Sequence, residues 1–304
     1  MTRRFLQAGL PAPRGWYQVA FTHAVPTGLS PAHLGGRCLM LVRDGERVRA
    51  FDAACPHRGA NLALSGRLDG EAVVCGFHGY SVHLGANDGY RLGTREHACT
   101  NVGGMVFVRL SADADHGWLA HLEALVRECD IVSGFEMRVQ APAATVIENA
   151  FDRRHFAAVH GVASTPFDVG ATPAGGLRVT STFEIPVAGG ARRSVLVPYQ
   201  ALVFGPGLAS VRLGGALPYV VVTGATPAPK GGCVIRLSLA LPRQPGRDGA
   251  DPAIVEPLLA HSRRGLEEDR AIWENLCPGA EPGWLPDDQA SLAFLDFCRA
   301  HDDG

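Results

Sequence analysis

The chain has 304 residues, which is enough for two domains with substantial hydrophobic cores. Hydrophobic residues account for 46% of the sequence and charged residues for 19%, a composition that excludes an intrinsically disordered protein. The net charge of −2 argues against a nucleic acid or an anionic membrane as a partner, and no apolar run is long enough to cross a bilayer.

The first residues contain Arg3-Arg4, the pair found in twin-arginine export signals. Pro11, Pro13 and Arg14 interrupt the apolar run that such a signal requires. Six of the eight cysteines are scattered without paired spacing, which is typical of free thiols in a reducing compartment. A cytoplasmic location is therefore expected.

Residues 15–110 are predicted to form short β-strands separated by turns. Residues 38–42 and 48–51 flank the turn signal Asp44-Gly45 and predict a hairpin. Residues 72–74 form a further strand, and residues 104–110 are expected to close a small β-module. Such a module provides a rigid scaffold for functional loops.

Two Cys/His pairs lie in the loops of this module. Cys55 and His57 form the first pair, and Cys75 and His78 form the second. Two thiolates and two imidazoles suit either one tetrahedral zinc ion or a [2Fe–2S] cluster with both cysteines on one iron. The C-x-H and C-x2-H spacings are unusual for zinc and favour iron–sulfur. A glycine follows each pair, so both loops can turn tightly and direct backbone N–H groups at sulfur.

The second region mixes predicted helices with several strands. Because the strands are grouped between helices, they predict an antiparallel sheet with helices on one side, an α+β domain. The predicted helical segments are residues 118–129, 146–160 and 253–276, and the strand-like runs are residues 178–187, 194–204, 219–226 and 233–241.

Polar residues gather on one face of the predicted helix 146–160. Asn149, Asp152, His155 and His160 share that face with apolar side chains, and burying them is costly unless they bind a metal or one another. A single buried histidine would more often be explained by hydrogen bonds within the core. Four such polar residues within twelve positions favour a functional site instead. On an ideal helix His155 and His160 are about 140° apart, so one ion must lie between them or the helix must be distorted.

The predicted C-terminal helix offers a carboxylate. Asp269 lies in the middle of its apolar stripe, whereas Glu267 and Glu268 are turned toward solvent. An acidic residue in that position needs a cation, and an ion pair with a core arginine is the alternative. Asp287 and Asp288 lie beside a proline and indicate a helix N-cap instead.

His155, His160 and Asp269 would form a two-histidine, one-carboxylate site, which leaves open positions on non-haem Fe(II) for O2. With these motifs in place, the sequence resembles the Rieske non-haem iron oxygenases. The stretches CPHRGA and CGFHGY resemble the cluster motifs of that family, and residues 149–160 resemble its N-x2-D-x2-H-x4-H motif. The similarity covers about residues 15–276 and is closest to the single-component α-subunit type, in which monooxygenation and O- or N-dealkylation are common.

The resemblance implies two cofactors and two domains. Residues 1–115 would form an all-β Rieske domain, and residues 116–304 a helix-grip catalytic domain with an antiparallel sheet. The Rieske [2Fe–2S] cluster would have its inner iron on the two cysteines and its outer iron on the two histidines. The ligands would be Cys55, His57, Cys75 and His78 for the cluster, and His155, His160 and Asp269 for a mononuclear Fe(II). Tyr80 departs from the family pattern, because tryptophan is usual there, and the chain is on the short side for the family.

The resemblance also implies partners. In a head-to-tail homotrimer, Asp152 would link His155 to His78 of the adjacent protomer and so carry electrons between cofactors. No Gly-x-Gly-x-x-Gly follows a predicted strand, so electrons would come from NAD(P)H through a separate reductase, with or without a ferredoxin.

The predicted function is that of the terminal component of a Rieske oxygenase. It would use O2 to hydroxylate or oxidatively dealkylate a small organic substrate, with Asp152 and Asn149 assisting the iron site. The alternative is a Rieske electron-transfer protein whose second domain binds a ligand without oxygen chemistry. Asn149, Asp152 and the three iron ligands favour the oxygenase, because a pure carrier does not need them. No residue pattern indicates the substrate.

Overall fold

A computed structural model of the chain describes residues 14–85, 91–112, 115–186, 194–277 and 282–302. Arg3-Arg4 and the prolines that follow lie outside these residues. The chain divides near residue 113 into two compact units, and Thr226–Gly231 belongs with the first. Among the described helices, none combines the length and the apolar character that crossing a membrane requires.

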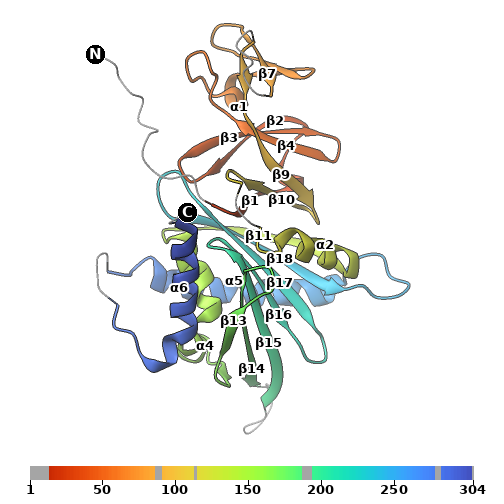
Figure 1. The fold of residues 1–304 in the computed structure, drawn as a ribbon. Coiled ribbons are helices and arrows are strands. Elements are labelled where there is room, and N and C mark those ends of the chain that lie inside the picture. Colours follow the sequence, from red (N-terminus) through yellow and green to blue (C-terminus); the bar gives the residue numbers. More distant parts are fainter. Residues whose placement is uncertain (1–13, 86–90, 113–114, 187–193, 278–281, 303–304) are drawn as a thin grey trace. The chain divides into compact units, whose positions relative to one another are not determined.

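The first unit is built on a six-stranded sheet with the order β1-β10-β9-β4-β3-β2 (Figure 1). Its strands are β1 (Trp16–Phe21), β2 (Gly28–Leu34), β3 (Arg37–Asp44), β4 (Arg47–Asp52), β9 (Glu96–Val102) and β10 (Met105–Arg109), with a short 3-10 helix η1 (Thr22–Ala24). The predicted hairpin is confirmed, because β3 and β4 pair across a turn in which Gly45 has a φ of 56°.

Strand β3 is apolar on both faces because it separates two cores. Leu39 and Leu41 pack into one hydrophobic cluster, whereas Met40 and Val42 pack into the other. Successive side chains of a strand point to opposite faces, so an uninterrupted apolar run is the pattern expected of a strand buried on both sides. The second of these cores also contains Cys55 and Cys75.

A four-stranded sheet carries the two predicted ligand loops. It consists of β5 (Arg67–Asp69), β6 (Ala72–Val74), β7 (Ser81–Leu84) and β8 (Gly93–Thr94). The first loop joins β4 to the short helix α1 (Leu62–Ser65), and the second joins β6 to β7. Asn61 begins α1, because its side chain accepts a hydrogen bond from the Ala63 N–H at 3.0 Å. Regular elements therefore hold both ends of each loop.

The second unit is an eight-stranded sheet with associated helices. The main order is β11-β18-β17-β16-β15-β14-β12, and β13 also pairs with β14. The strands are β11 (Cys129–Val139), β12 (Ala163–Ser164), β13 (Asp168–Ala171), β14 (Leu177–Pro186), β15 (Ser194–Gly205), β16 (Leu208–Leu213), β17 (Tyr219–Pro227) and β18 (Cys233–Pro242). The helices are α2 (Trp118–Glu128), α3 (Ala143–Glu148), η2 (Asn149–Phe151), α4 (Arg153–Ala158), α5 (Pro252–Trp273), η3 (Pro286–Asp288) and α6 (Gln289–Asp302).

The expected antiparallel α+β arrangement is confirmed, with one difference. Helices α3, α5 and α6 share one hydrophobic core with the sheet, including Val203 and Ala209. Helix α2 instead contacts the alternate residues of the same strands: Trp118 packs against Phe204 at a ring distance of 5.2 Å, and His121 hydrogen-bonds to Ser210. Because neighbouring residues of a strand face opposite ways, helices cover both faces of this sheet and not one.

The prediction of one continuous helix over residues 146–160 is wrong. The segment forms α3, η2 and α4, and the chain is extended at Asp152, with φ −97° and ψ 95°. The Asp152 carboxylate accepts a hydrogen bond from the His155 backbone N–H at 3.0 Å and so begins α4 as an N-cap. His160 lies beyond the end of α4, just before Gly161, which has a φ of 66°. The segment therefore has the distortion that two histidine ligands at this spacing require.

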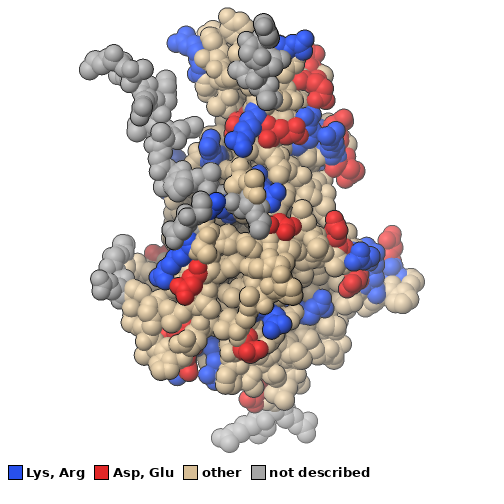
Figure 2. All heavy atoms as spheres, in the orientation of Figure 1, with Lys and Arg blue, Asp and Glu red and all other residues tan. Residues whose placement is uncertain are grey.

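Charged side chains of both signs are interspersed on the face drawn in Figure 2. In the first unit, for example, Arg49 forms ion pairs at 2.8 Å with both Glu71 and Glu96. Such mixing gives little net field over this face and agrees with the small net charge.

Candidate metal centres

The two Cys/His loops of the first unit share one backbone design. In each loop the cysteine N–H donates to the carbonyl five residues later, and the glycine N–H donates back to the cysteine carbonyl. These bonds are Cys55 to Ala60 at 2.8 Å, Gly59 to Cys55 at 2.8 Å, Cys75 to Tyr80 at 2.9 Å and Gly79 to Cys75 at 2.8 Å. The two glycines have φ values of 78° and 74°, which confirms the tight turns predicted for them.

The four predicted cluster ligands differ in how deeply they are buried. The thiols of Cys55 and Cys75 are buried, whereas the imidazoles of His57 and His78 are exposed and lie with their ring centres 4.7 Å apart. Burial, together with the adjacent Cys75 thiol, raises the pKa of Cys55. Two neighbouring sulfurs inside and two neighbouring imidazoles outside fit a [2Fe–2S] cluster with an inner and an outer iron.

Tyr80 lies against the two histidines. Its ring meets His57 edge-on at 4.8 Å and lies 6.3 Å from the ring of His78. Tyr80 and Phe77 are about half exposed, although both are large aromatic residues. Two exposed aromatic rings therefore lie beside the histidines on the outer side of the cluster site.

Replacing Gly76 with alanine is expected to prevent the second loop from holding its ligands. A Cβ atom at this position would lie 2.1 Å from the carbonyl oxygen of Ser65, so the backbone would have to move. The visible absorbance of the cluster, measured per protein, should fall sharply. Gly36→Ala is the control, because nothing lies within 4 Å of its Cβ; equal cluster content in the two variants would contradict the prediction.

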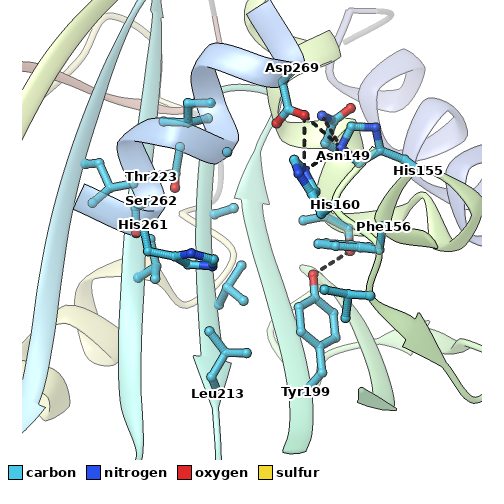
Figure 3. Close-up of a pocket in the computed structure, with 18 of the residues that line it drawn as sticks. Asn149, His155, Phe156, His160, Tyr199, Leu213, Thr223, His261, Ser262 and Asp269 are labelled. Carbon is cyan, nitrogen blue, oxygen red and sulfur yellow. Dashed lines mark hydrogen bonds and ion pairs between the residues drawn. The ribbon is translucent and has the colours of Figure 1, made fainter. Parts of the chain in front are cut away.

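In the second unit, three predicted ligands converge on one point (Figure 3). The Nε2 atoms of His155 and His160 lie 3.1 Å apart. Asp269 Oδ1 lies 3.0 Å from the first and 3.1 Å from the second. These predicted ligands come from α4, from the turn after α4 and from the C-terminal part of α5. Asp269 is 5% exposed, as its place in the apolar stripe predicted.

The spacing of these atoms fits three adjacent ligands of an octahedral ion. For metal–ligand bonds of about 2.1 Å, adjacent octahedral positions lie about 3.0 Å apart and tetrahedral positions about 3.4 Å apart. Asp269 Oδ1 is moreover buried without a hydrogen-bond donor among the described residues, although two imidazole nitrogens lie within 3.1 Å. The contacts are close but their directions are not those of hydrogen bonds, which is the situation a cation would resolve.

Asn149 and Trp273 complete the inner wall of this site. Trp273 Nε1 donates to Asn149 Oδ1 at 3.4 Å, and Asn149 Nδ2 faces His155 Nε2 at 3.1 Å. Since an indole N–H can only donate, the contact with Trp273 fixes the amide so that its N–H groups face His155. Asp152, by contrast, contacts His155 through the backbone as the cap of α4.

Glu268 also belongs to this site, which the sequence did not predict. Its Oε2 lies 3.0 Å from His160 Nδ1, whereas the helical pattern had turned it toward solvent. The side chain is 48% exposed, so the expected solvent-facing position on the helix is correct. The sequence did not predict that this side chain is long enough to contact His160. Asp287 lies apart from the three converging atoms: it accepts a hydrogen bond from Arg154 at 2.8 Å and so ties α4 to η3.

A cavity of about 430 Å³ opens beside the three ligands. Most of its wall is apolar and comes from strands β14 to β17, including Phe183, Tyr199, Leu213 and Val221. His261, Ser262 and Thr223 supply polar groups in another part of the cavity, on α5 and β17 (Figure 3). Such a cavity suits a mostly apolar small molecule with a few polar groups.

Tyr199 is expected to support the ligand segment through one hydrogen bond. Its hydroxyl donates to the Ala150 carbonyl at 2.8 Å, and burial raises its pKa well above the usual range, so it remains a donor. Tyr199→Phe keeps the ring stacked on Phe183 but leaves the carbonyl without its partner. Urea unfolding should show a loss of about 1 kcal/mol. Unchanged stability would show that the bond contributes nothing.

Comparison with protein families gives a match for each of the two units. Residues 15–89 match the Rieske [2Fe-2S] domain, and residues 109–293, more than half of the chain, match the 3-ketosteroid 9alpha-hydroxylase C-terminal domain. The chain belongs to the Rieske oxygenases. As a member of that family it is an oxidoreductase whose cofactors are a Rieske [2Fe–2S] cluster and a mononuclear iron.

Individual relatives of this Rieske oxygenase agree with the family. Cholesterol 7-desaturase of Xenopus laevis is 40% identical over 82 residues, which are 26% of this chain and 18% of the relative. The oxygenase component of chloroacetanilide N-alkylformylase from Rhizorhabdus wittichii is 44% identical over 71 residues, 23% of this chain and 20% of the relative. The aligned parts thus span a fifth or less of these proteins.

The fold has a solved counterpart along its whole length. Dicamba monooxygenase bound to 3,6-dichlorosalicylic acid superposes with a TM-score of 0.75, at 17% sequence identity. The superposition covers 97% of this chain and 98% of that one. The likeness confirms the expected fold class of a Rieske oxygenase.

Proposed function

We propose that this Rieske oxygenase is a terminal oxygenase component that hydroxylates or oxidatively dealkylates a small organic substrate with O2. The observation that carries the proposal is the convergence of His155, His160 and Asp269 beside an apolar cavity. A pure electron carrier needs neither a three-ligand site nor a cavity next to it. In this proposal the three residues hold Fe(II), and Cys55, His57, Cys75 and His78 hold the cluster.

Each residue near the iron site has a defined task. When bound, Fe(II) supplies open positions at which O2 is activated, and the cluster supplies single electrons. The imidazoles of His155 and His160 and the Asp269 carboxylate bind the ion through three atoms within 3.1 Å of one another. Asn149 places its amide N–H beside them. The apolar wall excludes water and holds the substrate next to the site.

The two units divide this work. In our proposal residues 1–115 carry the cluster and residues 116–304 carry the mononuclear iron. Exposed His57 and His78, with the aromatic rings of Phe77 and Tyr80 around them, support a head-to-tail trimer in which the cluster faces another subunit. Asp152 would then accept a bond from His78 of the partner subunit. A separate NAD(P)H reductase, with or without a ferredoxin, supplies the electrons.

The cavity supports an apolar substrate with a small number of hydrogen-bonding groups. A volume of about 430 Å³ is within the range of small-molecule sites and accommodates several fused or linked rings. The names of the matched family model and of the Xenopus laevis relative refer to steroids, which have this chemistry. We therefore propose polycyclic or elongated apolar molecules as the first class to test, with their polar group near His261 and Ser262.

The test is a single-turnover reaction. The protein with both cofactors is reduced anaerobically, mixed with one member of a panel of apolar and charged compounds, and exposed to O2. Mass spectrometry of the products distinguishes hydroxylation, a gain of one oxygen, from dealkylation, which releases an aldehyde. Product from apolar members supports the proposal. If no panel member gives product while the cluster is still reoxidised by O2, electron transfer without oxygenation is the better description.

A further inference from the structure

Glu268 is exposed on α5, yet its side chain contacts His160. Its carboxylate lies 3.0 Å from Nδ1 of His160, the nitrogen on the side of the ring away from the three-atom site. The other nitrogen of the same ring, Nε2, lies 3.1 Å from Asp269 Oδ1. One imidazole therefore lies between carboxylates from two consecutive residues of one helix.

This arrangement selects the form of His160 that can bind a metal. A carboxylate accepts only, so Nδ1 has to carry the proton in the contact with Glu268. In the neutral ring Nε2 is then left with its lone pair directed at the three-atom site. A carboxylate bound to the far nitrogen of a metal-binding histidine also fixes the plane of the ring and makes the ligand more basic.

Charge balance points in the same direction. A divalent ion at the site meets one negative ligand, Asp269, and two neutral imidazoles. The Glu268 carboxylate adds a second negative charge on the far side of the His160 ring, which balances the second positive charge of the ion. Neither Asn149 nor Trp273, which also contact the site, contributes charge.

We infer that Glu268 is a positioning residue that orients His160 and raises the affinity of the site for Fe(II). The inference rests on the proposed function, because it assumes that His160 binds iron. Removing the Glu268 carboxylate should therefore change the affinity for the metal more than it changes the stability of the metal-free protein. A purely structural role would not have this effect.

The experiment measures Fe(II) binding and not activity. Purified full-length protein, freed of mononuclear iron but with its cluster intact by visible absorbance, is titrated anaerobically with Fe(II) against a colorimetric chelator. The variants are Glu268→Gln, which removes the charge, and Glu268→Ala, which removes charge and acceptor together. Glu267→Gln is the matched control, because it removes the same charge from the neighbouring exposed position. His160→Ala tests whether this histidine contributes to Fe(II) binding. Melting temperatures measured without iron show whether each variant is as stable as the native protein.

We expect the dissociation constant for Fe(II) to rise about 10- to 100-fold in Glu268→Ala, less in Glu268→Gln, and not in Glu267→Gln. Native affinity in both Glu268 variants, or an equal loss in Glu267→Gln, would overturn the role of this contact while leaving the iron site in place. If His160→Ala binds Fe(II) as tightly as the native protein, the proposed function itself fails, and the assignment of Glu268 fails with it.

Discussion

Replacing Asp269 with alanine is expected to lower product formation by about a thousandfold or more while leaving the cluster in place. The metal provides several kcal/mol of catalysis, and the variant loses the only charged group among its three ligands. Fe(II) should raise the melting temperature of the native protein, because an ion that binds only the folded state stabilises it. The variant should show no such rise. Differential scanning calorimetry with and without Fe(II) measures this directly.

The control for Asp269 is Glu256→Ala, a change of charge at an exposed position of the same helix. It should keep both the iron-dependent stabilisation and the activity. An Asp269→Ala protein that retains either property would show that the carboxylate is not a ligand, and the alternative of a structural buried aspartate would then be preferred.

The second large effect is expected at Asp152, where capping and electron transfer can be separated. Asn and Ser cap helices about as well as Asp, whereas Ala costs about 1 kcal/mol. Asp152→Ser should therefore keep the cap of α4 and the affinity for iron, but its side chain is too short to bridge to another subunit. Product formation should be nearly abolished in Asp152→Ser and Asp152→Ala, with both cofactors bound. Stability should fall in Asp152→Ala alone.

Stopped-flow absorbance of the reduced cluster provides the decisive measurement. In both Asp152 variants, oxidation of the cluster by O2 in the presence of substrate should be slow. Near-normal turnover in Asp152→Ser would contradict the electron-transfer role and leave Asp152 as a helix cap only. A loss of turnover in Asp152→Ala that Ser restores would lead to the same conclusion.

The sequence was sufficient to find the three side chains that converge in the second unit, because their signals are local or periodic. Asp269 stands in an apolar stripe where a carboxylate is costly, and the structure buries it as that pattern required. Glu268 could not be found in this way. Its position on the helix is exposed, and only the length of its side chain and the place of His160 on a different segment bring the two together. The bond between Trp273 and Asn149 could not be found either, because it joins residues 124 positions apart.

The fold was predictable where turns and apolar runs are clear, as in the β3–β4 hairpin. It was not predictable at β11, where Ser133 and Gly134 interrupt the pattern. The register shifts there between Ser133 and Phe135, and a Cβ on Gly134 would lie 2.6 Å from the carbonyl oxygen of Leu237. The break in helix 146–160 was missed for a related reason: Asp152 is compatible with a helix interior by pattern, and only its use as a cap reveals the extended backbone.

That break also determines how the proposed iron ligands are held. Helices of three to six residues are too short to be stable alone, so α3, η2 and α4 depend on tertiary contacts. Segments of this kind open by local unfolding at a lower free energy than the surrounding sheet. Binding of an ion to His155, His160 and Asp269 joins this segment to the long helix α5. Amide hydrogen exchange of residues 149–160 should therefore slow when Fe(II) is added, while exchange in β14 to β18 stays the same.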